Sequence, residues 1–321
     1  MVSPAWAARV APVAGALVAD RALGEPPDAW HPVAWFGRAM TRAERYWWSD
    51  GRPRGAVYAA AGVGGAAAVG AVLAGGGTGR RGMGLAVAAY VAVAGRGLEE
   101  AAAAVGSALD AGDLERARLS LRSLVGRDTT RLDEEEIVRA TVESVAENTV
   151  DAVTAPLLWA LAGGPAAVLA YRAVNTLDAM VGHRSPRYER FGWASARADD
   201  AANWVPARVT AALVAALRPG RAGAVWAAVR RQAPAHPSPN AGVAEAAFAA
   251  ALGVGLGGVN DYAGRIEHRP LLGTGPAPRR ADIDRACRLS RQVAATLVAA
   301  AGLAAVGRRP RGATLTRSRP W

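Results

Sequence analysis

The chain has 321 residues, enough for two soluble domains or one compact helical membrane protein. Apolar residues make up 51% and charged residues 20% of the chain, which excludes a disordered polymer and a collagen-like repeat. The net charge is +11 and all 38 basic residues are arginine, so lysine chemistry of the Schiff-base or P-loop kind is excluded. A single cysteine, Cys287, excludes an intrachain disulfide and a thiolate metal cluster. The arginines are scattered and form no single stripe, so we expect no nucleic-acid binding.

Uncharged apolar runs divide the chain. The first run is interrupted by Arg9 and ends at Asp20 without a cleavage site, so we expect a short helix and no secretory signal. Two runs, 55–79 and 152–171, are long enough to cross the ~30 Å hydrocarbon core of a bilayer. The predicted apolar helices cover residues 10–19, 55–79, 82–95, 152–171, 204–217, 246–260 and 292–307.

These runs predict an all-α fold, a polytopic helical integral membrane protein with amphipathic or soluble helical loop segments. Strand patterns of period two are scarce. We expect one helical membrane domain over 1–307 and a basic, disordered tail over 308–321. A soluble helical protein with an alanine-packed core is the alternative, because a mean hydropathy of +0.09 is low for a membrane protein.

Carboxylates recur just before the run at 152–171. Glu143, Glu147 and Asp151 follow one another at i, i+4 and i+8, which places them on one face of a helix. Oxygen ligands of this kind suit Mg²⁺, which proteins commonly share with substrate phosphates. The alternative is a solvated helix face that binds nothing.

Two more oxygen-rich groups follow that run. Asn175 and Asp178 share a helix face, and Asp199 or Asp200 pairs with Asn203 at helical spacing. His183 and Arg197 lie between these groups in the sequence. Arginine could merely neutralise the carboxylates, or it could bind phosphate or carboxylate through its planar fork of donors. His183 could equally be structural.

A third polar group surrounds the apolar segment 246–260. Glu245 is an ionisable residue at the edge of an apolar helix, which favours a functional site. Ser238 and Asn240 precede it, and either could simply cap that helix.

Several multi-residue motifs occur in one order along the chain. They are DRALGEPPDAWHPVAWFGR, VGRDTTRLDEEEI, ESVAENTVDAVTAPL, AVNTLDAMVGHR, FGWASARADDAANWVPARVTA, and SPNAG followed by AEAA. Together they resemble the CobD/CbiB family, the adenosylcobinamide-phosphate synthases, over most of residues 20–305. The sequence departs from the family pattern at 242–244, where Gly-Val-Ala stands in place of an aromatic residue followed by proline.

The resemblance implies a multi-pass enzyme of the cell membrane. Members join (R)-1-amino-2-propanol or its O-phosphate to the ring D propionate of adenosylcobyric acid, so the corrinoid is a substrate. Because an amide does not form from a free carboxylate without activation, we expect ATP, Mg²⁺ and an acyl phosphate. Cytoplasmic ATP implies an active site that faces the cytoplasm. Other late cobalamin-pathway membrane enzymes are the expected partners.

Roles for the individual residues follow as a hypothesis. Glu147, Asp151 and Asp178 bind the metal, oriented by Asn148 and Asn175. His183 or Asp200 takes the proton from the attacking ammonium, because an amine attacks only when it is neutral. Arg197 acts with them and, together with Arg208, holds phosphate. The remaining expected substrate-binding residues are Asn203, Ser238, Asn240 and Glu245.

The hypothesis places a constraint on topology. A simple span over 152–171 would leave Glu147 and Asp178 on opposite sides of the bilayer, roughly 30 Å apart. Gly163-Gly164-Pro165 interrupts this run, so we expect a broken or re-entrant helical hairpin whose ends return to one side. Two other functions stay open, a Mg²⁺-dependent membrane transferase acting on a diphosphate or lipid substrate and a non-catalytic scaffold for corrinoid enzymes.

Overall fold

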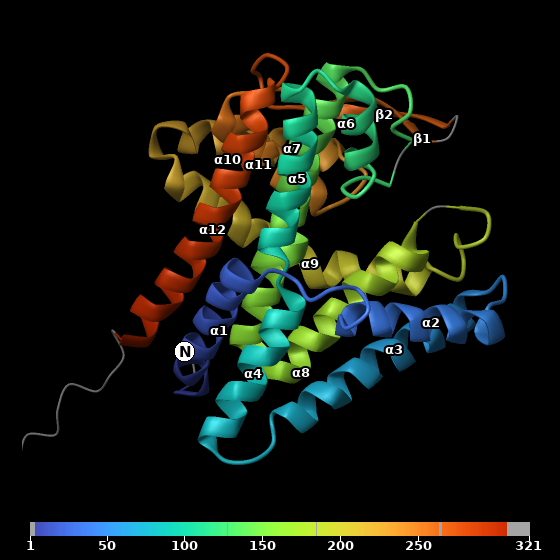
Figure 1. Ribbon diagram of the computed structural model, residues 1–321, viewed down its shortest axis with the longest axis vertical. Helices are drawn as coiled ribbons and strands as arrows, with labels where there is room; N and C mark the ends of the chain where they lie inside the picture. Colours follow the sequence, from blue (N-terminus) through green and yellow to red (C-terminus); the bar gives the residue numbers. More distant parts are fainter. Residues whose placement is uncertain (1–3, 127, 184, 263–264, 307–321) are drawn as a thin grey trace, which may run out of the picture.

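The structure is a computed structural model that describes residues 4–126, 128–183, 185–262 and 265–306. It confirms the predicted helical fold (Figure 1). Among the described residues the only sheet is an antiparallel pair, β1 (Leu256–Tyr262) and β2 (Arg265–Leu272), which the sequence analysis did not predict. The predicted tail at 308–321 lies outside the described residues.

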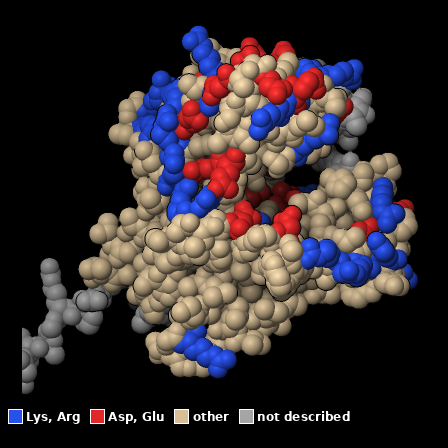
Figure 2. Space-filling model, viewed as in Figure 1, with Lys and Arg blue, Asp and Glu red and all other residues tan. Residues whose placement is uncertain are grey.

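The lower half of the molecule is an apolar helical body. Figure 2 shows an almost uncharged surface there, whereas charged side chains gather over the upper half. Small aliphatic side chains such as Val13, Leu85 and Leu157 fill its core. The helices that contribute to this body are α1 (Pro4–Leu23), α3 (Arg52–Leu73), α4 (Thr78–Ala92), α8 (Ala155–Leu177) and α12 (Arg280–Val306).

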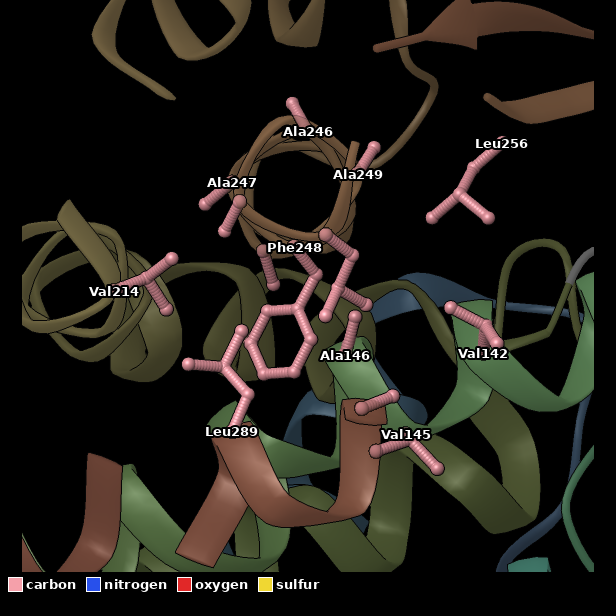
Figure 3. Packing of buried hydrophobic residues seen from close by; sticks show 14 of the residues in the cluster. Val142, Val145, Ala146, Val214, Ala246, Ala247, Phe248, Ala249, Leu256 and Leu289 are labelled. Atoms are coloured by element: carbon pink, nitrogen blue, oxygen red, sulfur yellow. The ribbon is translucent and has the colours of Figure 1, made fainter. Parts of the chain in front are cut away.

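The upper half packs around one buried helix, α11 (Ala241–Leu252), in which every residue is buried. Phe248 lies at the centre of this core, facing Leu289 and Ala146 (Figure 3). The surrounding elements are the β hairpin, the upper part of α12, α5 (Gly95–Asp110), α6 (Leu114–Leu121), α7 (Glu134–Thr149), α10 (Ala222–Arg231) and two short 3₁₀ turns (Pro219–Arg221 and Ala233–Ala235).

Two helices run across the others at the boundary between these halves. They are α2 (Pro32–Trp47) and α9 (Trp193–Leu217), which run sideways in Figure 1. Two π-helical turns connect α8 to its neighbours, η1 (Val150–Thr154) after α7 and η2 (Asp178–Gly182) after α8. Asp151 and Asp178 therefore both lie in π-helical turns, which occur frequently at functional sites.

The chain reverses in the middle of α8. Gly164 has φ 73° and ψ −156°, a combination that is essentially restricted to glycine. Pro165 starts the second half, where a missing N–H is not required. The Arg9 guanidinium donates to the carbonyl groups of Leu161 and Ala162, which the interrupted helix leaves without partners. The two halves of α8 consequently form a helical hairpin.

The turn of this hairpin lies beside the C-terminal end of α3. The backbone at Pro165 and Ala166 touches Gly70, close to the end of α3, and a side chain at Gly70 would overlap it. Gly55, at the other end of α3, lies equally close to the carbonyl of Phe191. Glycine thus allows α3 to pack directly on the second half of α8 and the loop that follows, as is typical of helices inside membranes.

Some predicted helix limits are wrong. The segment 55–79 is not one helix, because α3 ends at Leu73 and α4 begins at Thr78, ahead of the predicted start at 82. The turn between them contains no charged residue, so the charge pattern did not reveal where the first helix ends. The helix predicted over 246–260 ends at Leu252, since Gly253 adopts a left-handed φ of 76° that terminates helices, and β1 follows.

Within the part of the chain that the structure describes, three helical stretches are long and apolar enough to cross a membrane: Arg52–Leu73, Glu134–Gly182 and Arg280–Val306. The second contains the reversal at Gly164, so it would enter and return instead of crossing once. Membrane insertion as a hairpin stays a prediction of the fold.

Cysteine labelling tests this topology. In a Cys287→Ser background, Glu147→Cys and His183→Cys place thiols at exposed positions before and after the hairpin. In inside-out vesicles, we expect a membrane-impermeant maleimide to modify both thiols. A control thiol, Gly77→Cys in the α3–α4 turn, should instead be modified only in right-side-out vesicles. Labelling of 147 and 183 from opposite sides would refute the hairpin.

The core around α11 gives a stability prediction. Phe248 is completely buried, so Phe248→Ala should lower the free energy of unfolding by about 3–5 kcal/mol. Leu119→Ala is the control, because Leu119 is exposed on α6 and its loss should cost less than about 0.5 kcal/mol. Thermal unfolding of the purified protein in detergent measures both, and equal losses would contradict this account of the core.

Candidate active site

A cluster of carboxylates and amides joins η1, the second half of α8 and α9. The Asn175 side-chain amide donates to Asp151 Oδ2 and to Asp199 Oδ1, both at 3.3 Å. Asn203 donates to the second oxygen of Asp199 at 3.0 Å. Asp199, and not Asp200, is thus the partner of Asn203. We call Asp151, Asn175, Asp199 and Asn203 the carboxylate–amide cluster.

The Tyr171 hydroxyl connects two segments of this cluster. Its hydroxyl lies 2.9 Å from Asn203 Oδ1 and 3.0 Å from the carbonyl oxygen of Asp151. Because Tyr171 is buried, this contact satisfies a polar group that would otherwise be costly to bury. The two ends of the reversed segment, 151 and 171–175, are therefore held side by side on one level.

Two further predicted metal ligands lie beside the cluster. Glu147 is exposed but surrounded by protein, as on the wall of a cleft, and lies within electrostatic reach of Asp199 and Arg269. Asp178 lies within reach of Asp199 and Asp200. Gly182 packs on the Asp178 carboxylate so closely that a side chain there would overlap it. Figure 2 shows acidic side chains within the hollow between the upper half and the part of the molecule around α2.

The acidic residues do not form a complete metal centre by themselves. Within the described part of the chain, no three Asp, Glu, His or Cys side chains converge as metal ligands would. Burial raises the pKa of Asp199, while donation from Asn203 and Asn175 lowers it. Burial also raises the pKa of Asp200, and the nearby Arg197 lowers it. Close carboxylates disfavour one another's charged form, and either a proton or a cation beside them relieves the repulsion.

A cavity of about 760 Å³ opens next to the cluster. Three chain segments enclose it, namely one face of α9, the loop after η2, and the segment from the end of α10 to the start of α11. The predicted residues that line it are His183, Arg197, Asp200 and Arg208, and Arg52 joins them from the start of α3. Asp200 lines this arginine-rich cavity, while its neighbour Asp199 belongs to the carboxylate–amide cluster, so α9 separates the two.

Arg208 is the best-positioned cation of the cavity. Its guanidinium donates to Asn240 Oδ1 at 3.1 Å and to the carbonyl of Trp204 at 3.0 Å, and it stacks on the Trp204 ring. Among the described residues no carboxylate forms an ion pair with it, so its charge remains available to an anionic ligand. Asn240 also donates to the backbone carbonyl of Asp200 at 2.8 Å, which ties α11 to α9.

Arg197 and His183 are more exposed. Arg197 lies 3.8 Å from Asp200 and is largely in solvent. His183 packs edge-to-face on Tyr188, with ring centroids 5.0 Å apart. Tyr188 donates in turn to Glu44 at 2.9 Å, and Arg187 pairs with the same carboxylate. The loop that carries His183 is thereby fastened to α2.

Not all predicted residues point into the site. The Asn148 amide donates to Ser144 of its own helix at 2.9 Å and does not orient a carboxylate. Ser238 accepts from the N–H groups of Asn240 and Ala241, so it caps α11. Glu245 is buried 3.6 Å from His236. The structure thus assigns local structural contacts to Asn148 and Ser238.

Sequence reasoning missed several residues of this region. Arg52 lies far from the acidic motifs in sequence, whereas Tyr171 lies four residues before Asn175 and His236 two residues before Ser238, but no local pattern distinguishes any of them. His236 Nε2 lies 2.6 Å from Arg269 Nη1, a strand residue brought across by the unpredicted hairpin. Asp199 was considered only as an alternative to Asp200, and helical spacing alone could not separate the two.

Comparisons with known proteins agree with these observations. The family model described as "CobD/Cbib protein" matches residues 13–290. Cobalamin biosynthesis protein CobD of Mycobacterium tuberculosis is 46% identical over 320 residues, covering 97% of this chain and 100% of the relative. The proteins of the same name from Rhodobacter capsulatus and Synechocystis are 43% identical over 307 residues (89% of this chain, 94% of the relative) and 50% identical over 192 residues (58% and 56%). No solved structure matches. The chain belongs to the CobD/CbiB family, the adenosylcobinamide-phosphate synthases of cobalamin biosynthesis.

Proposed function

We propose that this protein forms the amide bond between an amino alcohol, (R)-1-amino-2-propanol or its O-phosphate, and the ring D propionate of adenosylcobyric acid, with ATP as the source of activation. The observation that carries the proposal is that α9 holds the carboxylate–amide cluster on one side and forms the wall of an arginine-lined cavity on the adjacent side. Amide formation requires an activated carboxylate and a neutral amine in one place. The arginines of the cavity can bind phosphate or carboxylate oxygens, and the carboxylates nearby can bind a metal or an ammonium group.

The donor set of the cluster fits Mg²⁺. Magnesium is usually bound through one or two carboxylates together with substrate phosphates, so a site without three converging protein ligands is consistent with a metal that arrives with ATP. Asp151 and Asp199 would hold it, with Glu147 and Asp178 beside them, and Asn175 sets their spacing. When bound, the metal would neutralise phosphate charge.

The chain's own residues then bind and position the reactants. Arg208 and Arg197 neutralise phosphate or carboxylate oxygens at the cavity wall, and Arg52 adds a third guanidinium. His183 or Asp200, both on the same cavity, accepts the proton that the ammonium group must lose before it attacks. No protein nucleophile is needed, in agreement with the burial of Cys287.

The membrane part of the proposal rests on the apolar lower body and its three candidate stretches. We propose that the protein lies in the cell membrane with the upper half and the site on the cytoplasmic side, where ATP is available. Contact with other membrane enzymes of late cobalamin synthesis stays a prediction. A transferase that acts on a lipid would need a lipid-sized apolar cleft, whereas this cavity is lined by arginine, histidine and carboxylate as well as apolar groups.

A single-turnover assay tests the proposed reaction. Detergent-solubilised protein is mixed with adenosylcobyric acid, ATP, Mg²⁺ and the amino alcohol, with or without its phosphate, and products are identified by mass. We expect an amide product together with hydrolysed ATP, with the preferred amine giving the faster reaction. Corrinoid binding without any amide product would favour the scaffold function and contradict the proposal.

Replacement of the cluster carboxylates tests the metal assignment. Asp151→Asn and Asp199→Asn keep the size and can still accept from Asn175, but each removes one negative charge. We expect turnover at limiting Mg²⁺ to fall at least about tenfold and to recover in part at high Mg²⁺. Glu135→Gln, in the exposed first turn of α7, should leave the Mg²⁺ dependence unchanged. Variants that keep full turnover at limiting Mg²⁺ would remove the assignment.

A further inference from the structure

Helix α9 presents a regular series of aromatic and charged side chains on one face. Trp193, Arg197, Asp200, Trp204 and Arg208 follow at spacings of four, three, four and four residues, which places all five on one stripe of the helix. Four of them line the cavity. Trp204 lies on the same stripe between Asp200 and Arg208, so its ring faces the same side.

Both tryptophans remain accessible even though each carries an arginine. Trp193 is 42% exposed and Trp204 is 53% exposed. The guanidinium carbon of Arg52 lies 5.3 Å from the Trp193 ring centroid, and that of Arg208 lies 4.3 Å from that of Trp204. Indole rings and guanidinium groups both offer flat faces on which a conjugated ring can stack.

The polar groups between the two tryptophans differ from those of a lipid-facing surface. Arg197 and Asp200 interrupt the aromatic stripe, and Arg208 has no ion pair among the described residues. An aromatic belt that anchors a protein at the membrane surface does not require a cavity, whereas this stripe forms the wall of one. The stripe therefore fits a ligand that is flat, conjugated and rich in polar or anionic substituents.

The length of this stripe on α9 favours one of the substrates of the proposed reaction. Trp193 and Trp204 are eleven residues apart in a helix, about 16 Å along its axis. A purine ring is too small to reach both tryptophans, but a corrin macrocycle with its peripheral amide side chains is large enough. Arg197 and Arg208 would meet the amide and carboxylate groups at its edge.

We infer that this face of α9, from Trp193 to Arg208, is the platform on which the corrin ring of the substrate lies. The inference rests on the proposed function and adds to it the surface that binds the macrocycle. The ring would lie along α9, with its reacting propionate directed toward the carboxylate–amide cluster on the adjacent side of the same helix.

Direct binding tests the platform without turnover. Equilibrium dialysis of the full-length protein in detergent against adenosylcobyric acid, in the absence of ATP, is read from the visible absorbance of the corrin. Trp193→Leu and Trp204→Leu should each weaken binding roughly tenfold, because an aromatic stacking contact is typically worth about that factor. Trp35→Leu is the matched control, since Trp35 is 48% exposed on α2 and does not line the cavity.

Further variants separate stacking from folding and corrin from nucleotide. Trp204→Phe keeps a flat ring and should retain most of the affinity, whereas equal losses in Trp204→Phe and Trp204→Leu would overturn the stacking role. Binding of a non-hydrolysable ATP analogue should be unchanged in all variants. A loss confined to the ATP analogue would assign the platform to the nucleobase and overturn the inference.

The outcomes also distinguish this inference from the function on which it rests. If the unmodified protein binds the corrinoid and both leucine variants bind it within twofold as tightly, the platform is wrong while the proposed function stands. If the unmodified protein binds no corrinoid at all, the proposed function fails and the platform fails with it.

Discussion

The reversal of the chain at Gly164 is the constraint on which the candidate site depends. Without it, the apolar segment after Asp151 would continue in one direction, and Asn175 would lie at the far end of a helix more than 30 Å long. With it, Asn175 lies within hydrogen-bond distance of Asp151. The reversal is possible because Gly164 adopts a backbone conformation closed to other residues and Arg9 satisfies the carbonyls that it frees.

The helix α9 transmits this arrangement to the cavity. On one side, Asp199 and Asn203 bond to residues of the reversed hairpin. On the adjacent side, Asp200 and Arg208 line the cavity, and Asn240 holds both to the start of α11. A single helix therefore fixes the distance between the carboxylates and the arginines. Because α9 runs across the other helices, it can present both sides at the boundary between the apolar and the charged halves (Figures 1 and 2).

The sequence predicted those features that are encoded locally. The Gly-Gly-Pro interruption and the helical spacing of Glu147 and Asp151 can both be read within a few residues. Contacts between distant segments could not be predicted in this way. Even within one helix, spacing alone did not show that the Asn148 amide donates to Ser144, four residues earlier. The run after Leu252 looked helical because its apolar residues continue past Gly253. The choice between Asp199 and Asp200 required the position of α8.

The absence of a side chain at Gly242 has a structural reason in this chain. His236 packs against the first turn of α11 so closely that any side chain at Gly242 would overlap its Cβ and ring. His236 in turn contacts Glu245 and Arg269, which lie on α11 and β2. The Nδ1 atom of His236 lies 3.1 Å from both the backbone nitrogen and the carbonyl oxygen of Ser238, so the ring is also held to the loop before α11. Glycine at 242 thus allows a buried histidine to connect the cavity wall with the β hairpin, and a larger residue there would require His236 to move out of the position in which it lines the cavity.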